Sequence, residues 1–125
     1  MNKIVERIVS LVKSVSTTIE CFVEGSIKLV NVSDICYIES VDKTAVVYCE
    51  KGNYRTRFRL YQLNEMLCDK GFVQISKYCI LNLNKLDTIK PLFNSRMEAV
   101  LSNGIRLFVN RKYLADIKQK LKELE

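Results

Sequence analysis

The 125-residue sequence contains no histidine and no tryptophan, and only one proline. Without histidine, neither a Ser-His-Asp nor a Cys-His triad can form, and the usual general base near neutral pH is missing. A zinc site would need cysteines or carboxylates alone. The four glycines are isolated, so the sequence also lacks a glycine-rich phosphate loop. We therefore expect no enzymatic activity, no cofactor and no metal site.

Long apolar runs are absent too. No segment approaches the roughly 20 apolar residues that a membrane-spanning helix needs. The N-terminal sequence MNKIVERIVSLVKS carries Glu6 and Arg7 inside its apolar pattern and has no small-residue cleavage site, so it does not read as a secretory signal. The sequence predicts a cytoplasmic protein without membrane insertion.

Cysteine is present, but not in the patterns of a disulfide framework or a metal site. The five cysteines are odd in number, widely spaced and never arranged as CxxC. We interpret them as buried, reduced thiols, with a redox-sensing thiol as the alternative. The positions are Cys21, Cys36, Cys49, Cys68 and Cys79, of which Cys79 is the redox candidate.

Positive charge exceeds negative charge, with 20 Lys and Arg against 14 Asp and Glu and a net charge of +6. A basic domain is attracted to polyanions, which here means nucleic acid or an anionic membrane surface. The length predicts one globular domain with a single core.

The first 18 residues differ in pattern from the remainder. Apolar residues recur at helical spacing over residues 3–16, which predicts an amphipathic helix. This helix packs on its own domain, links to an upstream domain or forms a dimer contact; the pattern alone leaves these three readings open. Residues 1–18 are therefore assigned to an N-terminal helix or linker and residues 19–125 to the main domain. The apolar positions are Ile4, Ile8, Leu11, Val12 and Val15.

From residue 19 the apolar period changes to two, which predicts β-strands. Turn signals at Gly25-Ser26 and Asp42-Lys43 separate short strands, and residues 19–32 read as a hairpin. Helical spacing from Leu60 to Lys70 ends at Gly71, which suits the left-handed residue just past a helix.

Further along, Asn103-Gly104 is a type I′ hairpin signal, and Asn110 can cap a final helix. The predicted fold is mainly β, of the α+β kind: short antiparallel strands with one inserted short helix and a C-terminal helix. The apolar stripe of the final helix consists of Leu114, Ile117, Leu121 and Leu124.

Two segments place basic residues where they are exposed. Residues 54–60 alternate Arg55, Arg57 and Arg59 with Tyr54, Thr56, Phe58 and Leu60, which predicts one strand with three guanidinium groups on one face. These groups repel one another, so they need solvent, acidic neighbours or a bound polyanion. In residues 70–86, Ser76-Lys77 interrupts two apolar runs, which predicts a surface loop.

Four blocks, in order, resemble the LytTR family, the DNA-binding output domains of bacterial response regulators. They cover roughly residues 19 to 122, and their joint order and spacing carry the resemblance. The blocks are DICYIES at 34–40, Arg57 through Leu67, GFVQISKYCILNLNKL at 71–86, and Asn103 through Lys112. The family implies an elongated fold of antiparallel sheets in which loops, rather than a recognition helix, enter successive major grooves.

By this resemblance, the Ser76-Lys77 loop and the Asn110-Arg111-Lys112 loop are the principal base-reading elements, and Asp42-Lys43-Thr44 is a phosphate-facing turn. Arg111 can donate two hydrogen bonds to O6 and N7 of guanine, and Lys77 can reach the same atoms or a phosphate. The alternatives are that Arg111 closes the final helix and that Lys77 is a solvated loop residue. Residues expected to position the DNA backbone are Lys43, Arg55, Arg57, Arg59, Lys85 and Lys112.

The sequence departs from the family pattern at three of these positions. Ser76 stands where the family often has histidine, Arg59 where it commonly has serine, and Asn110 where it has serine. Ser76 can bond to a phosphate or a base edge but discriminates poorly, so the recognised base is left open. Asn110 keeps the capping chemistry, and Arg59 can add a phosphate contact.

We therefore expect a sequence-specific transcription regulator that binds paired direct repeats in promoter DNA, with two copies on one DNA. Its further partners are an upstream receiver domain or a protein that binds the N-terminal helix. The alternative is an interaction module of the same fold that uses its basic loops and N-terminal helix against a protein or membrane surface.

Overall fold

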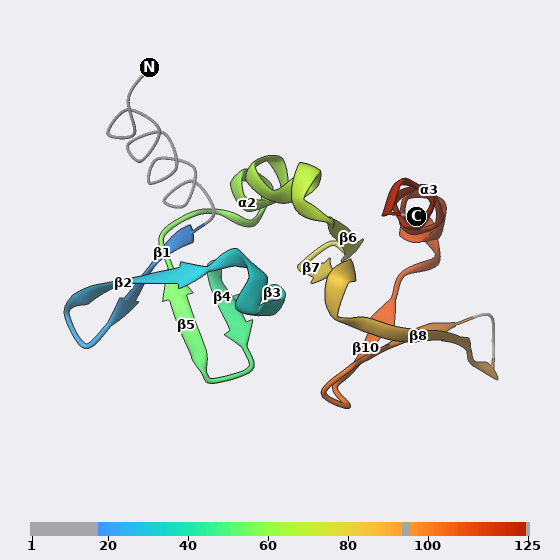
Figure 1. Ribbon diagram of the computed structural model, residues 1–125, viewed down its shortest axis with the longest axis horizontal. Helices are drawn as coiled ribbons and strands as arrows, with labels where there is room; N and C mark the ends of the chain where they lie inside the picture. The colour runs from blue at the N-terminus through green and yellow to red at the C-terminus, as the bar shows by residue number, and fades with distance from the viewer. Residues whose placement is uncertain (1–17, 94–95, 125) are drawn as a thin grey trace, which may run out of the picture.

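The computed structural model describes residues 18–93 and 96–124. The helix predicted over residues 3–16 lies outside these residues. The described chain forms two antiparallel sheets that lie side by side along the long axis of the molecule (Figure 1). The larger sheet has the strand order β2-β1-β5-β4-β3-β7-β6, and the smaller one has the order β10-β9-β8. The predicted mainly β, α+β fold with elongated antiparallel sheets is confirmed.

The chain runs through the larger sheet first and the smaller sheet last. The strands of the larger sheet are β1 (Thr18–Val23), β2 (Ser26–Asn31), β3 (Ile35–Val41), β4 (Thr44–Cys49), β5 (Asn53–Thr56), β6 (Phe72–Ser76) and β7 (Cys79–Asn82). The smaller sheet consists of β8 (Leu86–Pro91), β9 (Met97–Leu101) and β10 (Arg106–Val109), and the helices are α2 (Leu60–Leu67) and α3 (Leu114–Leu124).

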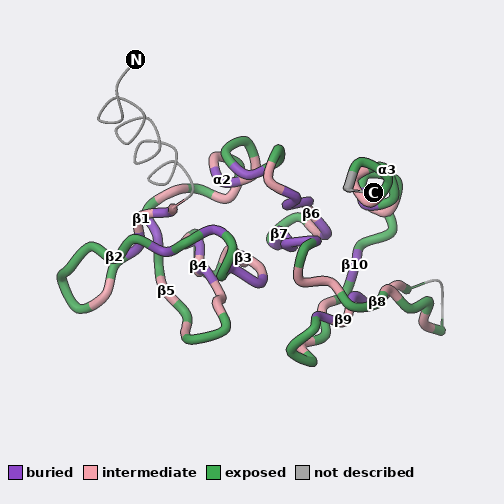
Figure 2. Tube along the Cα trace, viewed as in Figure 1, coloured by how far each residue is buried: buried purple, intermediate pink, exposed green. Residues whose placement is uncertain are grey.

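Two hydrophobic clusters lie on opposite faces of β3, β6 and β7. Leu63 and Leu67 of α2 pack with Phe72 and Ile80 on one face. Val73, Ile75 and Leu81 face the other way, toward the smaller sheet and α3. All four residues of β7 are buried, which explains why its sequence lacks the alternation of a half-exposed strand. Figure 2 shows this burial in β6 and β7, at the edge of the larger sheet that faces the smaller one.

The turns follow the sequence signals closely, with differences in detail. The first hairpin turns at Glu24-Gly25, one residue earlier than predicted, and Asp42-Lys43 forms a turn with positive φ at both residues. The type I′ prediction for Asn103-Gly104 is wrong, because only Gly104 has a positive φ. Instead, Gly104 N donates to the Leu101 carbonyl at 2.9 Å, and the Asn103 side chain accepts from Ile105 N at 3.1 Å.

The predicted strand with three arginines on one face is wrong. Strand β5 ends at Thr56, whose hydroxyl donates to the Glu20 carbonyl at 2.7 Å, and the chain bends at Arg57. Arg59 is the N-cap residue of α2, where its backbone N–H donates to Gln62 Oε1 at 2.8 Å. Only Arg55 therefore lies on the strand, because the N-cap of α2 comes three residues after the strand ends.

Both predicted helix ends are confirmed. Helix α2 continues as a 3-10 turn through Lys70, and Gly71 follows in the left-handed conformation with φ +87°. Asn110 caps a 3-10 turn over Arg111–Tyr113 that leads into α3. On α3, Ile117 is fully buried against the second cluster, as its place in the predicted apolar stripe requires.

Candidate nucleic-acid interface

Strand register places two predicted contact turns side by side. Strand β3 pairs with β4 up to Val41 and Thr44, so the Asp42-Lys43 turn follows directly from the end of β3. The same end of β3 lies beside β7, where Ser40 N donates to the Tyr78 carbonyl at 2.8 Å. The turn that contains Lys77 therefore lies next to the Lys43 turn.

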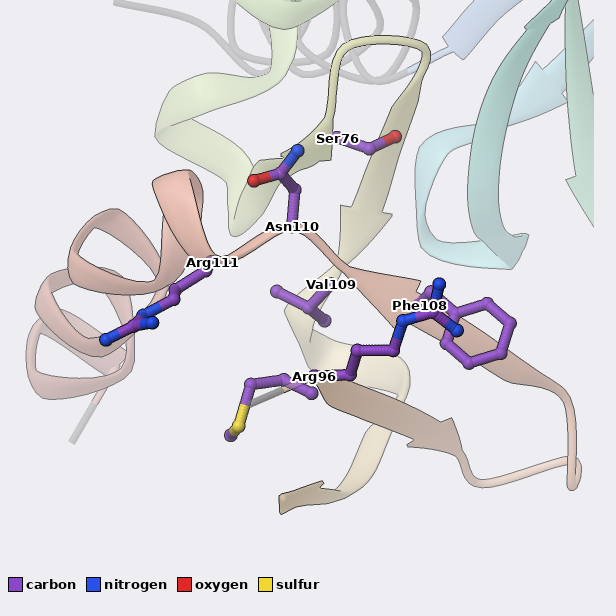
Figure 3. Close-up of a pocket in the computed structure, with 7 residues that line it drawn as sticks. Ser76, Arg96, Phe108, Val109, Asn110 and Arg111 are labelled. Atoms are coloured by element: carbon purple, nitrogen blue, oxygen red, sulfur yellow. The ribbon is translucent and has the colours of Figure 1, made fainter. Parts of the chain in front are cut away.

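The connection between β10 and α3 also lies next to these two turns, because it is hydrogen-bonded to β6. Asn110 N donates to the Ile75 carbonyl at 2.7 Å, which fixes the start of the β10–α3 connection beside the end of β6. Figure 3 draws Ser76 and Asn110 close together. We call residues 42–43, 76–78 and 110–112 together the loop end of the molecule. Segments separated by more than 30 positions in the sequence meet there.

Asn110 shapes the last of these segments through its side chain. Its Oδ1 accepts a hydrogen bond from Lys112 N at 2.9 Å, so the amide caps the turn that carries Arg111 and Lys112. The same device recurs where Asn31 and Asn82 end their strands and cap short 3-10 turns. Asn110 therefore has a local structural role besides the DNA contact expected from sequence.

Arg111 is exposed, and its side chain extends away from Ser76 and Asn110 alongside the start of α3 (Figure 3). No hydrogen bond, ion pair or ring contact to another described residue holds its guanidinium. Lys77 and Lys112 are also exposed, with their ammonium groups 5.4 and 5.8 Å from the ring centres of Tyr78 and Tyr113. These cations can turn toward a ligand without breaking an ion pair.

Lys43 and the arginines after β5 form the other side of the loop end. The Arg59 guanidinium donates to the Lys43 carbonyl at 3.0 Å and so ties the turn to the start of α2. Arg57 pairs with Glu20 at 3.1 Å, and both side chains remain largely exposed. A hollow of about 490 Å³ is lined by Lys43, Arg55, Arg57 and Arg59. Apart from Lys85, the predicted contact residues thus lie at or beside the loop end.

Two residues that sequence reasoning missed line a second hollow, of about 560 Å³, together with Ser76, Asn110 and Arg111. The Arg96 guanidinium lies 5.7 Å from the ring centre of Phe108, which is 64% exposed (Figure 3). No sequence motif marks Arg96. Phe108 had one available signal, since it is a large aromatic residue at the outward position before Val109.

Lys85 is the backbone-positioning residue that does not reach this site. Its ammonium pairs with Glu50 at 3.2 Å. Glu50 follows β4 and therefore lies one strand length, about 20 Å, from the Lys43 turn that precedes β4. Lys85 therefore lies apart from the other residues predicted to position the DNA backbone.

Cys79 lies beside the loop end but is only 6% exposed. Burial, followed by the nearby Glu39 carboxylate, raises the pKa of its thiol to about 12. The thiolate is the reactive form, so this residue is chemically inert near neutral pH and does not suit a redox sensor. Cys21 and Cys36 are buried as predicted, whereas Cys68 is exposed.

Other kinds of site find no support in the described residues. Residues 18–93 and 96–124 contain no group of three or more cysteines and carboxylates that could hold a metal ion. In the same part of the chain, neither helix is long and apolar enough to cross a membrane.

Antiparallel sheets whose turns gather exposed cations at one end define a small β domain suited to a polyanion. The sequence model of the LytTr DNA-binding domain matches residues 25–122. The chain belongs to this family of DNA-binding domains, which occur in bacterial response regulators and other transcription regulators.

Relatives and a solved structure agree with the family match. The chain is 32% identical over 100 residues to the sensory transduction protein LytT of Bacillus anthracis, covering 80% of this chain and 41% of that protein. It is 26% identical to an uncharacterized HTH-type transcriptional regulator of Staphylococcus aureus, covering 97% and 83%. A LytTr DNA-binding domain from Bacillus cereus has the same fold, with a TM-score of 0.77 at 22% identity, covering 84% and 96%. The chain thus spans about two fifths of the LytT protein's length.

Proposed function

We propose that this domain binds promoter DNA sequence-specifically and reads bases in the major groove with its loop end. The observation that carries the proposal is the strand register, which brings residues 42–43, 76–78 and 110–112 to one end of the larger sheet. Sequence is read at base edges, while contacts to phosphates position the protein. The loop end supplies side chains for both tasks.

Arg111 is the principal base-reading residue in this proposal. Its exposed and unpaired guanidinium can donate two parallel hydrogen bonds to a guanine. Lys77 and Ser76 read a neighbouring base or hold its phosphate, and Asn110 contributes its free amide N–H groups while its oxygen caps the turn.

The remaining cations position the DNA backbone. Lys43 and Lys112 are exposed on either side of the reading loops and can contact phosphates directly. Arg57 exchanges its partner Glu20 for a phosphate, and Arg59 adds its charge while it holds the Lys43 turn. Each phosphate contact releases counterions, so the affinity should fall steeply with salt concentration.

We propose further that two copies bind paired direct repeats about one helical turn apart, because one loop end covers only a short stretch of DNA. In this proposal residues 19–125 form the DNA-binding unit, residues 1–18 form a helix or linker, and the protein acts in the cytoplasm. The LytT proteins are longer than this chain, which supports an additional upstream receiver domain as one architecture for the whole regulator.

Selection from a random duplex library tests the proposal at near-physiological salt. We expect enrichment of a guanine-containing half-site repeated in the same orientation at a spacing near 10 base pairs. Duplexes with one half-site, and with the second half-site inverted, serve as controls. Recovery of an inverted repeat would contradict the direct-repeat arrangement, and enrichment of no sequence would contradict specific reading.

A further inference from the structure

One part of the larger sheet exposes large apolar side chains. Ile27 and Leu29 of β2 are 62% and 55% exposed, and Phe22 of β1 is 41% exposed. Register pairs Phe22 with Ile27, so their side chains project from the same face, and Leu29 shares that face because it lies two residues from Ile27. We call Phe22, Ile27 and Leu29 the outer patch. Figure 2 shows most of β2 as exposed.

The outer patch lies on the face that the smaller sheet covers elsewhere. Residues that pair directly across neighbouring strands project from the same face of a sheet. The pairs Phe22–Arg55, Arg55–Val46, Val46–Glu39 and Glu39–Cys79 therefore place Phe22 on the same face as Cys79, which belongs to the second hydrophobic cluster. The opposite face of β1 and β2 contributes Ile19, Cys21 and Val30 to the cluster under α2. Among residues 18–93 and 96–124, no helix or strand covers the outer patch, because β8–β10 and α3 lie at the far end of the molecule (Figure 1). One side chain borders it: the Arg57 guanidinium lies 6.0 Å from the ring centre of Phe22, which also lines the hollow beside Lys43.

The chain itself supplies a matching cover. Residues 3–16 carry an apolar stripe at helical spacing that ends at Val15, so only Ser16 and Thr17 separate the stripe from β1. As a helix they would measure about 21 Å, which matches the roughly 20 Å length of the six-residue strand β2. Connections of two residues between a helix and a strand are common.

From this match we propose that residues 3–16 form a helix that packs its apolar stripe on the outer patch of the same chain. The short tether favours this occupant over a separate protein, because it keeps the local concentration of the helix high. The charged positions of the helix, which include Lys3, Arg7 and Lys13, then stay in solvent.

Amide hydrogen exchange of the full chain tests this packing. We expect the amides of residues 4–15 to exchange more slowly than in an isolated peptide of the same sequence. Leu29→Asp should remove this protection, since it places a charge where the helix packs. Phe93→Asp is the matched control, because Phe93 is 89% exposed and lies just past the end of β8, in the smaller-sheet half of the molecule, so the change should leave the protection unchanged.

Two checks separate loss of packing from loss of fold. The amides of β3 and β7 must stay protected in Leu29→Asp, and Leu29→Thr, which keeps a strand-forming residue, should reduce protection of residues 4–15 in the same direction. The proposal is overturned if residues 4–15 are unprotected in the wild type or if both Leu29 variants leave them protected. Protection that grows with protein concentration, together with a dimeric mass, would instead assign the patch to a second copy.

Discussion

At the scale of single residues, Asn110 combines a cap with a place at the proposed DNA surface. Its Oδ1 caps the Arg111–Tyr113 turn by accepting from Lys112 N at 2.9 Å, whereas its amide nitrogen has no partner among the described residues. Stability and DNA affinity therefore depend on different atoms of one side chain. Substitutions that keep one and change the other can separate the two roles.

Asn110→Asp should leave the free energy of unfolding within about 0.5 kcal/mol of wild type, because a carboxylate also accepts the capping hydrogen bond. Its affinity for a selected duplex should fall at least about tenfold, since the new charge faces phosphates. Asn110→Ala should lower the stability by about 1 kcal/mol through loss of the cap. Urea unfolding and anisotropy titrations measure the two effects. If Asn110→Asp binds the duplex as tightly as the wild type, Asn110 does not lie at the DNA surface.

The Cys79 thiol predicts a pH dependence of stability. Burial raises its pKa to about 12, well above the roughly 8.5 of an unfolded cysteine. The unfolded chain therefore loses this proton first as pH rises, and the stabilisation that is complete below about pH 8 disappears between about pH 9 and 12. Urea unfolding between pH 9 and 11 should show a decline that is shallower in Cys79→Ala, by about 1.4 kcal/mol per pH unit. An equal slope in both proteins would contradict the buried thiol.

At the scale of elements, the Asp42-Lys43 turn has a backbone conformation that lowers stability, but it carries an exposed positive charge. Lys43 has a φ of +67°, which glycine adopts without strain, so Lys43→Gly should raise the stability by about 0.5 kcal/mol. The same change removes an exposed cation and should weaken DNA binding and reduce its salt dependence. The Lys43 carbonyl that accepts from Arg59 remains in place.

Glu24→Gly is the matched control for that prediction. Glu24 also has a positive φ, of +48°, but its turn lies at the opposite end of β1 from the Arg57–Glu20 pair. It should stabilise the fold by a similar amount without weakening DNA binding. Equal affinities for wild type and Lys43→Gly would exclude Lys43 from the DNA surface.

Sequence predicted the elements well where the signal is local. The end of α2 at Gly71 and the cap at Asn110 depend on neighbouring residues, and both are confirmed. The prediction of a strand with three arginines failed because the strand ends at Thr56. The Thr56 hydroxyl donates a hydrogen bond to the Glu20 carbonyl, 36 positions away in the sequence, which no local pattern reveals. Arg96 and Phe108 were missed for a related reason: only tertiary packing brings them beside Ser76 and Asn110.

At the scale of the whole molecule, the long axis runs from β2 at one end to the smaller sheet and α3 at the other (Figure 1). The loop end lies on one side of this axis. Its turns at residues 42–43 and 76–78 directly follow β3 and β6, and Asn110 is hydrogen-bonded to Ile75 of β6. The turn at Lys51, between β4 and β5, lies on the opposite side. This separation provides a charge-matched control within the same sheet.

The most direct test of the central claim is an anisotropy titration with a selected repeat duplex and its scrambled version at fixed, near-physiological salt. Arg111→Ala and Lys51→Ala each remove one exposed positive charge, at opposite ends of the sheet. If the loop end reads bases, Arg111→Ala should lose about 1 to 3 kcal/mol of binding free energy on the selected duplex and little on the scrambled one, while Lys51→Ala changes neither. Equal losses for the two variants, or equal losses on both duplexes, would contradict base reading by Arg111.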